Sequence, residues 1–149
     1  MNFCSQKIPA GVKTLFIVVL SHLAFYSYGQ IEPVRSGVYR WADHTIRKSE
    51  DRESRKILEG TSPHFEYLEI HATTQFPGAK PSATHANEDI EEVIIVKEGL
   101  MKITIEGQST ILGEEGVILL MPQQMHSLAN IGEGPLTYYV MRYRSKQPM

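Results

Sequence analysis

Hydrophobic and polar residues alternate along most of the chain after Gly60, with the two-residue period of half-buried β-strands. In HFEYLEIHATTQF, the apolar side chains of Leu68, Ile70 and Ala72 fall on one face, which we expect to face the core, and His71 falls on the other. The segment EVIIVKEGLMKITIEGQSTILGEEGVILLMP predicts about three or four short strands separated by turns, and HSLAN and LTYYVMRYR predict two more. No later segment has the period of a useful helix, so we expect an all-β sandwich or small barrel.

The pattern before Gly60 is less regular. VYRW (residues 38–41) fits a short first strand. The following residues, 42–60, are dense in charge and lack an apolar stripe. We therefore expect a mobile, polar loop there, with a short strand near Ile57 and Leu58.

The first 29 residues have the order of a secretory signal. MNFCSQKIPAGVK carries two lysines and no acid, and the apolar run LFIVVLSHLAFY follows it. Ser27 and Gly29 supply small residues for cleavage before Gln30. A membrane anchor is the alternative, but a span needs about 20 apolar residues and this run is shorter. We expect an exported, periplasmic or extracellular protein of bacterial type, without a stable membrane span in its mature form.

The composition excludes several kinds of partner and of catalytic chemistry for the mature chain. Cys4 is the single cysteine, so cleavage would leave neither a disulfide nor a thiol nucleophile. The full chain has a net charge of −2, and loss of Lys7 and Lys13 makes it more acidic. With no basic stripe except RYRSK near the C-terminus, we expect no nucleic-acid partner. The absence of a Gly-x-Ser-x-Gly elbow and of a phosphate-binding loop leaves metal-assisted or acid/base chemistry.

Polar residues among the predicted strands have the spacing of a metal site. His85 and Asn87 stand two residues apart, so their side chains point to one side of an extended chain. Glu92 and His126 each share parity with the apolar residues of their own strand, which places them on the predicted core face. An imidazole or a carboxylate buried alone is costly, and a metal ion would satisfy all of these groups together.

These residues resemble the two sequence motifs of the cupin superfamily. The first motif, which reads Gly, His-x-His, Glu, Gly, corresponds in order to Gly78, His85, Asn87, Glu92 and Gly99. The second motif corresponds to Gly116, Pro122, His126 and Asn130. The short intermotif segment LMKITIEGQSTILGEE is similar to that of compact microbial cupins.

The resemblance implies a single-domain cupin with a jelly-roll-like β-barrel. We expect three parts: the signal peptide in residues 1–29, an N-terminal strand and charged loop in residues 30–62, and the barrel in residues 63–149. Single-domain cupins are often dimers, so the resemblance also implies a homodimer.

By position, the resemblance implies that His85, Glu92 and His126 are metal ligands. Asn87 replaces the second histidine of the first motif, and we expect it to hydrogen-bond a ligand or water rather than coordinate. Two histidines and a carboxylate suit a divalent ion such as Fe, Mn, Ni or Zn. The alternative is a polar network in the barrel mouth without metal.

The sequence does not decide the roles of three other polar side chains. Tyr138 and Arg142 share parity, and either could contact a metal or a substrate. A buried tyrosine that is internally hydrogen-bonded, and an exposed arginine, are the structural alternatives. We expect His71 to lie at the surface or in an interface; the alternative is that it lines a pocket, if the register of its strand is reversed.

Three functions are consistent with these features. The first is a metal-dependent enzyme acting on a small polar metabolite, of the dioxygenase, isomerase, lyase or hydrolase type. The second is a non-enzymatic module that binds a small molecule. The third is a structural dimer module, in which the VYRW strand adds to the sheet of a partner.

Overall fold

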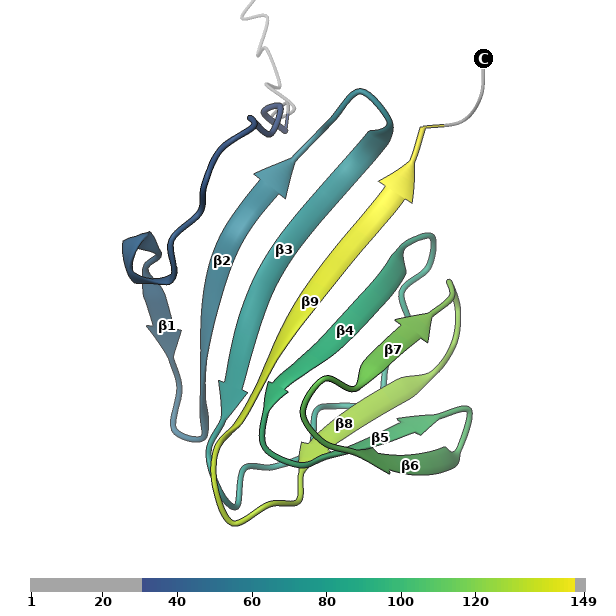
Figure 1. Ribbon diagram of the computed structural model, residues 1–149. Coiled ribbons are helices and arrows are strands. Elements are labelled where there is room, and N and C mark those ends of the chain that lie inside the picture. Colours follow the sequence, from purple (N-terminus) through teal and green to yellow (C-terminus); the bar gives the residue numbers. More distant parts are fainter. Residues whose placement is uncertain (1–30, 147–149) are drawn as a thin grey trace, which may run out of the picture.

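The computed structural model describes residues 31–146, which form an almost entirely β domain (Figure 1). The strands are β1 (Ile46–Lys48), β2 (Arg52–Gly60), β3 (Phe65–Gln75), β4 (Glu91–Glu98), β5 (Met101–Ile105), β6 (Gln108–Leu112), β7 (Val117–Leu120), β8 (His126–Asn130) and β9 (Leu136–Ser145). Within residues 31–146 the only helical element is the turn η1 (Trp41–Asp43), so the all-β prediction is confirmed. The predicted signal peptide lies outside the described residues.

The strands form two antiparallel sheets. The larger sheet has the order β1-β2-β3-β9-β4-β7, and the smaller sheet has the order β6-β5-β8. Figure 1 shows the smaller sheet beside β4 and β7, with β1 and β2 at the opposite edge of the larger sheet. The two sheets make a jelly-roll fold, as predicted.

The hydrophobic core lies between the smaller sheet and the β9-β4-β7 part of the larger one. Ile94 and Val140 face it from the larger sheet, and Met101 and Leu128 face it from the smaller sheet. Burial of such side chains contributes roughly 1.5–3 kcal/mol each to folding. No residue of β1 or β2 belongs to this cluster, so the hydrophobic core does not cover the inner face of that part of the sheet.

The prediction of a polar loop over residues 42–60 is wrong for most of its length. Residues 46–60 instead form β1, a tight connection and β2, and β2 pairs with β3 along its whole length. These charged strands are stabilised by cross-strand pairing, which the periodicity of one segment does not report. The larger sheet therefore begins before residue 63, where we expected the barrel to start.

The segment VYRW does not form the predicted strand. Residues 38–40 are irregular, and Trp41 begins η1. The Trp41 ring packs edge-on against Tyr139, at a centroid distance of 6.1 Å, and the Arg55 guanidinium lies 4.6 Å from its centroid. Contacts of this aromatic side chain with the outer face of the sheet outweigh the local preference for an extended chain.

The surface prediction for His71 is also wrong. The register pairs Glu69 with Arg142 and Thr73 with Tyr138, and cross-strand partners share a face. Tyr138 is buried in the core, so the face of β3 that carries His71 is the inner one. Both faces of this central strand are partly covered, and alternation alone does not tell which one points inward.

No helix within residues 31–146 is long and apolar enough to cross a membrane.

Candidate functional site

The segment that carries His85 is irregular but runs antiparallel to β8. The Ser82 N–H donates to the Leu128 carbonyl (2.8 Å), and the Leu128 N–H donates to the Ser82 hydroxyl (2.9 Å). Further along, the His85 N–H donates to the His126 carbonyl (3.0 Å), and the His126 N–H donates to the His85 carbonyl (2.8 Å). This bridge places the two histidines, forty-one residues apart, directly opposite each other.

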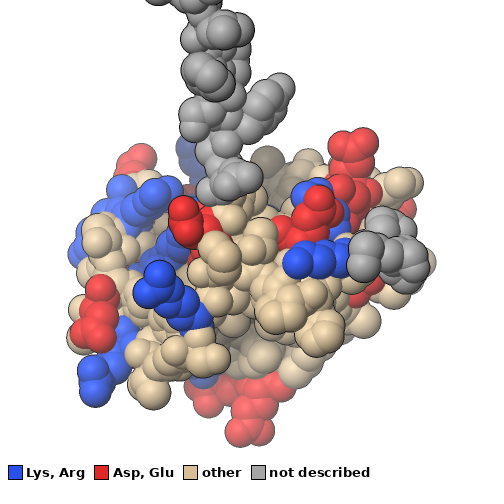
Figure 2. Space-filling view, turned by 90° about the horizontal axis from the view of Figure 1, so that it is seen from above, with Lys and Arg blue, Asp and Glu red and all other residues tan. Residues whose placement is uncertain are grey.

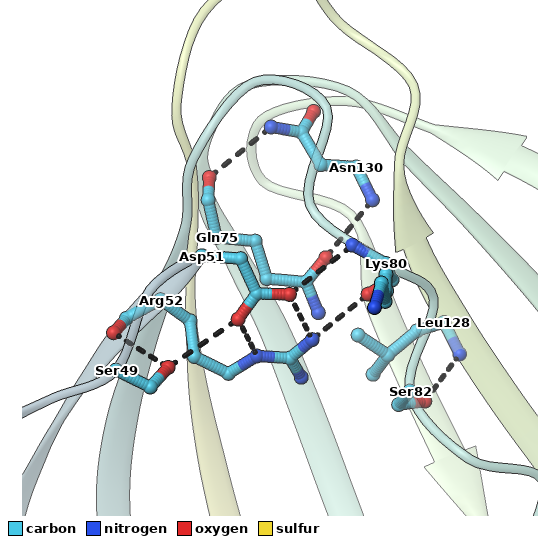
Figure 3. Close-up of polar contacts among 8 residues, drawn as sticks. All are labelled: Ser49, Asp51, Arg52, Gln75, Lys80, Ser82, Leu128 and Asn130. Carbon is cyan, nitrogen blue, oxygen red and sulfur yellow. Dashed lines mark hydrogen bonds and ion pairs between the residues drawn. The ribbon is translucent and has the colours of Figure 1, made fainter.

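A second set of contacts holds the start of this segment (Figure 3). Asp51 accepts a hydrogen bond from the Lys80 N–H at 3.1 Å, and the Arg52 guanidinium donates to the Lys80 carbonyl at 2.8 Å. The same guanidinium makes a two-point ion pair with Asp51. The β1–β2 hairpin therefore fixes the loop that leads to His85, although it is remote from it in sequence.

Asn130 anchors the other end of β8. Its side-chain amide donates to the Gln75 and Gly134 carbonyls, and its oxygen accepts from the Gly132 N–H (3.1, 2.9 and 2.9 Å). Figure 3 shows the contact with Gln75, whose side chain also accepts from the Asn130 N–H. These bonds satisfy the buried side chain of Asn130 and close the turn that follows it, so Asn130 has a structural role.

The imidazole rings of His85 and His126 face each other, and the same nitrogen of each ring lies near a backbone carbonyl. Their ring centroids are 4.4 Å apart. Nδ1 of His85 lies 3.0 Å from the Ala83 carbonyl, and Nδ1 of His126 lies 2.9 Å from the Gln124 carbonyl. Because a carbonyl only accepts, each Nδ1 carries a proton, and in the neutral imidazole each Nε2 then has the free lone pair. This is the tautomer that metal-binding histidines adopt when a second group orients them.

Glu92 completes the group from β4. Its side chain is buried, and its Oε2 accepts hydrogen bonds from Arg142 Nε (2.8 Å) and from Asn87 Nδ2 (3.0 Å). Its Oε1 lies 4.0 Å from His126 Nε2. The buried Nε2 of His126 has no hydrogen-bond partner within residues 31–146. The structure thus places His126 next to both of the other predicted ligands, with its ring against that of His85 and its Nε2 near Glu92 Oε1.

The side chains do not form a finished metal centre as they stand. In the part of the chain that the structure describes, no three His, Cys, Asp or Glu side chains are grouped closely enough to hold a metal ion. The donor types nevertheless fit a divalent ion, because Nε2 of each neutral imidazole has a free lone pair and Glu92 Oε1 accepts no hydrogen bond from Arg142. Asn87 donates to Glu92, so it orients that carboxylate, and its amide nitrogen cannot act as a ligand.

Arg142 links this group to a second carboxylate. Its Nη1 lies 3.8 Å from Glu69 Oε2, so the guanidinium sits between two carboxylates that are both buried. Burial alone would lower the pKa of Arg142, but the hydrogen bond to Glu92 and the charges of Glu92 and Glu69 outweigh it and raise that pKa. Arg142 is therefore a fixed positive charge in the site rather than an exposed strand residue.

Glu69 is the residue that the sequence interpretation missed. His71 Nδ1 lies 3.2 Å from Glu69 Oε1, and the Tyr67 hydroxyl donates to Oε2 at 2.6 Å. His71, then Tyr67 and Arg142, lower the pKa of Glu69 from 4.5 to about 2 against the opposing effect of burial. The parity shared by Glu69 and His71 could have revealed this group, had the inward face of β3 been assigned correctly.

Tyr138 lies away from the three predicted ligands. It faces inward, as parity allowed, but it stands opposite Val96 and Thr73 rather than beside Glu92. Burial raises the pKa of Tyr138, so its hydroxyl keeps its proton. Its side chain borders a separate cavity on the inner face of the sheet.

The comparisons with known proteins agree with this architecture. A family model described as "Cupin domain" matches residues 73–142, a range that contains the predicted ligands and Arg142. A comparison with curated protein sequences gives no match.

Three solved structures illustrate the similarity. The cupin domain of Cnp3 from Schizosaccharomyces pombe is 13% identical, with a TM-score of 0.63, over 74% of this chain and 75% of that chain. A predicted oxalate decarboxylase from Thermotoga maritima is 15% identical, with a TM-score of 0.62, over 72% and 99%. An RmlC-like cupin from Shewanella frigidimarina is 13% identical, with a TM-score of 0.60, over 76% and 95%. At these identities the likeness shows the fold alone.

We predict that Arg142→Met destabilises the domain by about 2 kcal/mol, because it leaves two buried carboxylates without their cation. The value lies below that of a fully buried pair, since solvent reaches part of the Arg142 side chain. Arg144→Met is the matched control on the same strand, because its partners Glu66 and Asp89 are exposed and its loss should cost less than about 1 kcal/mol. Urea unfolding with a chelator present measures both.

The pH dependence of the difference in stability between the wild type and Arg142→Met is a second test of the role of Arg142. The low folded pKa of Glu69 contributes stability that is complete above its unfolded value near 4.5 and is lost as the pH falls toward about 2. Arg142 is one cause of this low pKa and His71 is the largest, so the advantage of the wild type over Arg142→Met should shrink over that window by the part that Arg142 contributes. Equal destabilisation by the two arginine variants at pH 7 would contradict the role given to Arg142.

Proposed function

Because this chain belongs to the cupin superfamily, we propose that it binds a small polar metabolite in its barrel through a divalent metal ion held by His85, Glu92 and His126. The observation that carries the proposal is that both histidines are oriented in the same way by backbone carbonyls. Each Nδ1 faces a backbone carbonyl, and the Nε2 of His126 is buried without a partner near Glu92 Oε1. Leaving a buried nitrogen unsatisfied is costly, and a metal ion would remove that cost.

Each residue has a distinct task in this proposal. His85 and His126 would donate Nε2, and Glu92 would donate Oε1, while Arg142 and Asn87 hold its other oxygen. A bound divalent ion would supply Lewis-acid polarisation of a carbonyl or carboxylate oxygen of the metabolite. His85 is exposed, so this side of the site is the one open to a metabolite.

The same residues support a metal-free binding module as a second candidate. The guanidinium of Arg142 already compensates Glu92, so the buried carboxylate does not require a metal ion for its stability. In that case the barrel would bind its small molecule by hydrogen bonds alone. Metal binding by the purified protein separates the two candidates.

We predict that the protein binds about one divalent ion per chain, measured by calorimetry with Mn²⁺, Ni²⁺ and Zn²⁺. His85→Ala and His126→Ala should each weaken that binding by at least about tenfold, because each removes one of few ligands. His64→Ala is the control, since His64 is exposed on a turn outside the group. Asn87→His, which restores the second histidine of the motif, should strengthen binding. Absence of binding, or binding that survives both alanine variants, would refute the metal proposal and favour the metal-free module.

We also propose a homodimer formed through the outer face of β4 and β7. Four apolar side chains on this face are exposed by 44–65%: Ile95, Val117, Leu119 and Met121. The pairs Ile95 with Val117 and Val93 with Leu119 place them on one continuous surface. Contiguous exposed apolar residues on a sheet favour association with another chain.

Light scattering coupled to size exclusion tests this surface. The wild type should have the mass of a dimer, and Leu119→Glu should shift it to a monomer, because a charge on the apolar surface opposes association. Ile111→Glu on β6 is the control, since Ile111 is 59% exposed on the other sheet. A monomeric wild type, or a dimer that persists in Leu119→Glu, would rule this surface out.

Export completes the proposal and rests on the apolar run of residues 15–26 with its flanking lysines and small residues. The mature protein recovered from its native host should begin at Gln30. Intact-mass spectrometry measures this directly, and a mature chain that retains residues 1–29 would count against export.

A further inference from the structure

A cavity lies on the inner face of the larger sheet, on the far side of Arg142 from Glu92. Its volume is about 460 Å³, within the range of small-molecule sites. Neither His126 nor Glu92 borders it. It exists because the core side chains come from β9, β4, β7 and the smaller sheet, so the inner face of β1, β2 and β3 is not filled by apolar side chains.

The rim of this cavity is cationic. Four basic side chains of the β1–β2 hairpin border it, namely those of Arg47, Lys48, Arg52 and Lys56. Figure 2 shows Lys and Arg side chains gathered on the side of the molecule where β1 and β2 lie in Figure 1. The one carboxylate in the lining is Glu69, whose charge is already opposed by Arg142 and hydrogen-bonded by Tyr67. The local field in the cavity therefore favours an anion.

Some of these cations also contact neighbouring acids. Arg52 pairs with Asp51, Lys48 with Glu53, and Lys56 with Glu59. The Lys48 and Lys56 side chains are 66% and 44% exposed, and such surface pairs are worth little. A bound anion can therefore recruit these side chains without a large cost.

The floor of the cavity offers neutral hydrogen-bonding groups. Ser54, Thr73 and Tyr138 stand in one row across β2, β3 and β9, because the register pairs Ser54 with Thr73 and Thr73 with Tyr138. Their hydroxyls can each donate and accept. His71 stands in the next inward-facing row, opposite Lys56, with Nδ1 toward Glu69, which leaves Nε2 for a ligand.

We propose that this cavity is a binding site for a small, hydroxylated organic anion. The rim cations would hold its carboxylate or phosphate group, and the floor would accept and donate hydrogen bonds to its hydroxyls. The site does not need a metal ion, since none of the three predicted metal ligands borders it. A negative result for the metal site would therefore not contradict this proposal, and a negative result for this cavity would not contradict the metal site.

Calorimetry with three matched pyranoses tests the site in the presence of a chelator, at constant ionic strength. The probes are D-glucuronate, D-glucose 6-phosphate and neutral D-glucose. At least one of the two anions should bind, and D-glucose should bind at least about tenfold more weakly, because it lacks the charged group. The tighter anion identifies the rim as a carboxylate or a phosphate site.

Variants locate the binding within the cavity. Arg47→Gln combined with Lys56→Gln should weaken binding of the anion by about tenfold, and His71→Asn should weaken it as well. Lys102→Gln is the control for loss of charge, since Lys102 is exposed on β5 in the other sheet. Binding of D-glucose as tight as that of the anions, no binding of either anion, or anion binding unchanged in the rim variants would overturn the proposal. Thermal unfolding of each variant excludes loss of fold as the cause.

Discussion

The guanidinium of Arg142 is the contact on which the polar interior of this domain depends. It lies between Glu92 and Glu69, two buried carboxylates on β4 and β3, the strands that flank β9 in the sheet. Without this cation, Glu92 would need a proton or a metal ion to remain buried, whereas Glu69 would keep His71 and Tyr67 as partners. With it, Glu92 keeps one oxygen free for the histidines, and Glu69 keeps one for His71. One side chain of β9 thus supports two polar groups, one on each side.

Backbone pairing explains why the two histidines meet. The segment that contains His85 has no regular strand of its own, yet it runs along β8 and exchanges two backbone hydrogen bonds at His126. Its beginning is held by Asp51 and Arg52 from the β1–β2 hairpin. The charged hairpin therefore has a structural task in the candidate site, in addition to bordering the anion-binding cavity that we propose.

Much of this arrangement could be predicted from the sequence, and the failures have definite causes. The two motifs predicted the jelly-roll fold and selected His85, Glu92 and His126, and the structure places His126 beside each of the other two. Parity placed Glu92 with the core residues, and the structure agrees. The segment over residues 46–60 was misread because its strands are stabilised by pairing with β3, and the partner of a strand is not visible in local periodicity. Glu69 and His71 were misplaced because both faces of β3 are partly covered.

The central claim is that the free Nε2 atoms of the two histidines and the free oxygen of Glu92 form one metal site. Anomalous X-ray diffraction from crystals of the Mn²⁺- or Zn²⁺-loaded protein measures it most directly. The account predicts a single strong peak about 2.1 Å from Nε2 of His85, Nε2 of His126 and Oε1 of Glu92, with Arg142 still bound to Oε2. The absence of a peak among these three side chains, or a peak held by other residues, would contradict it.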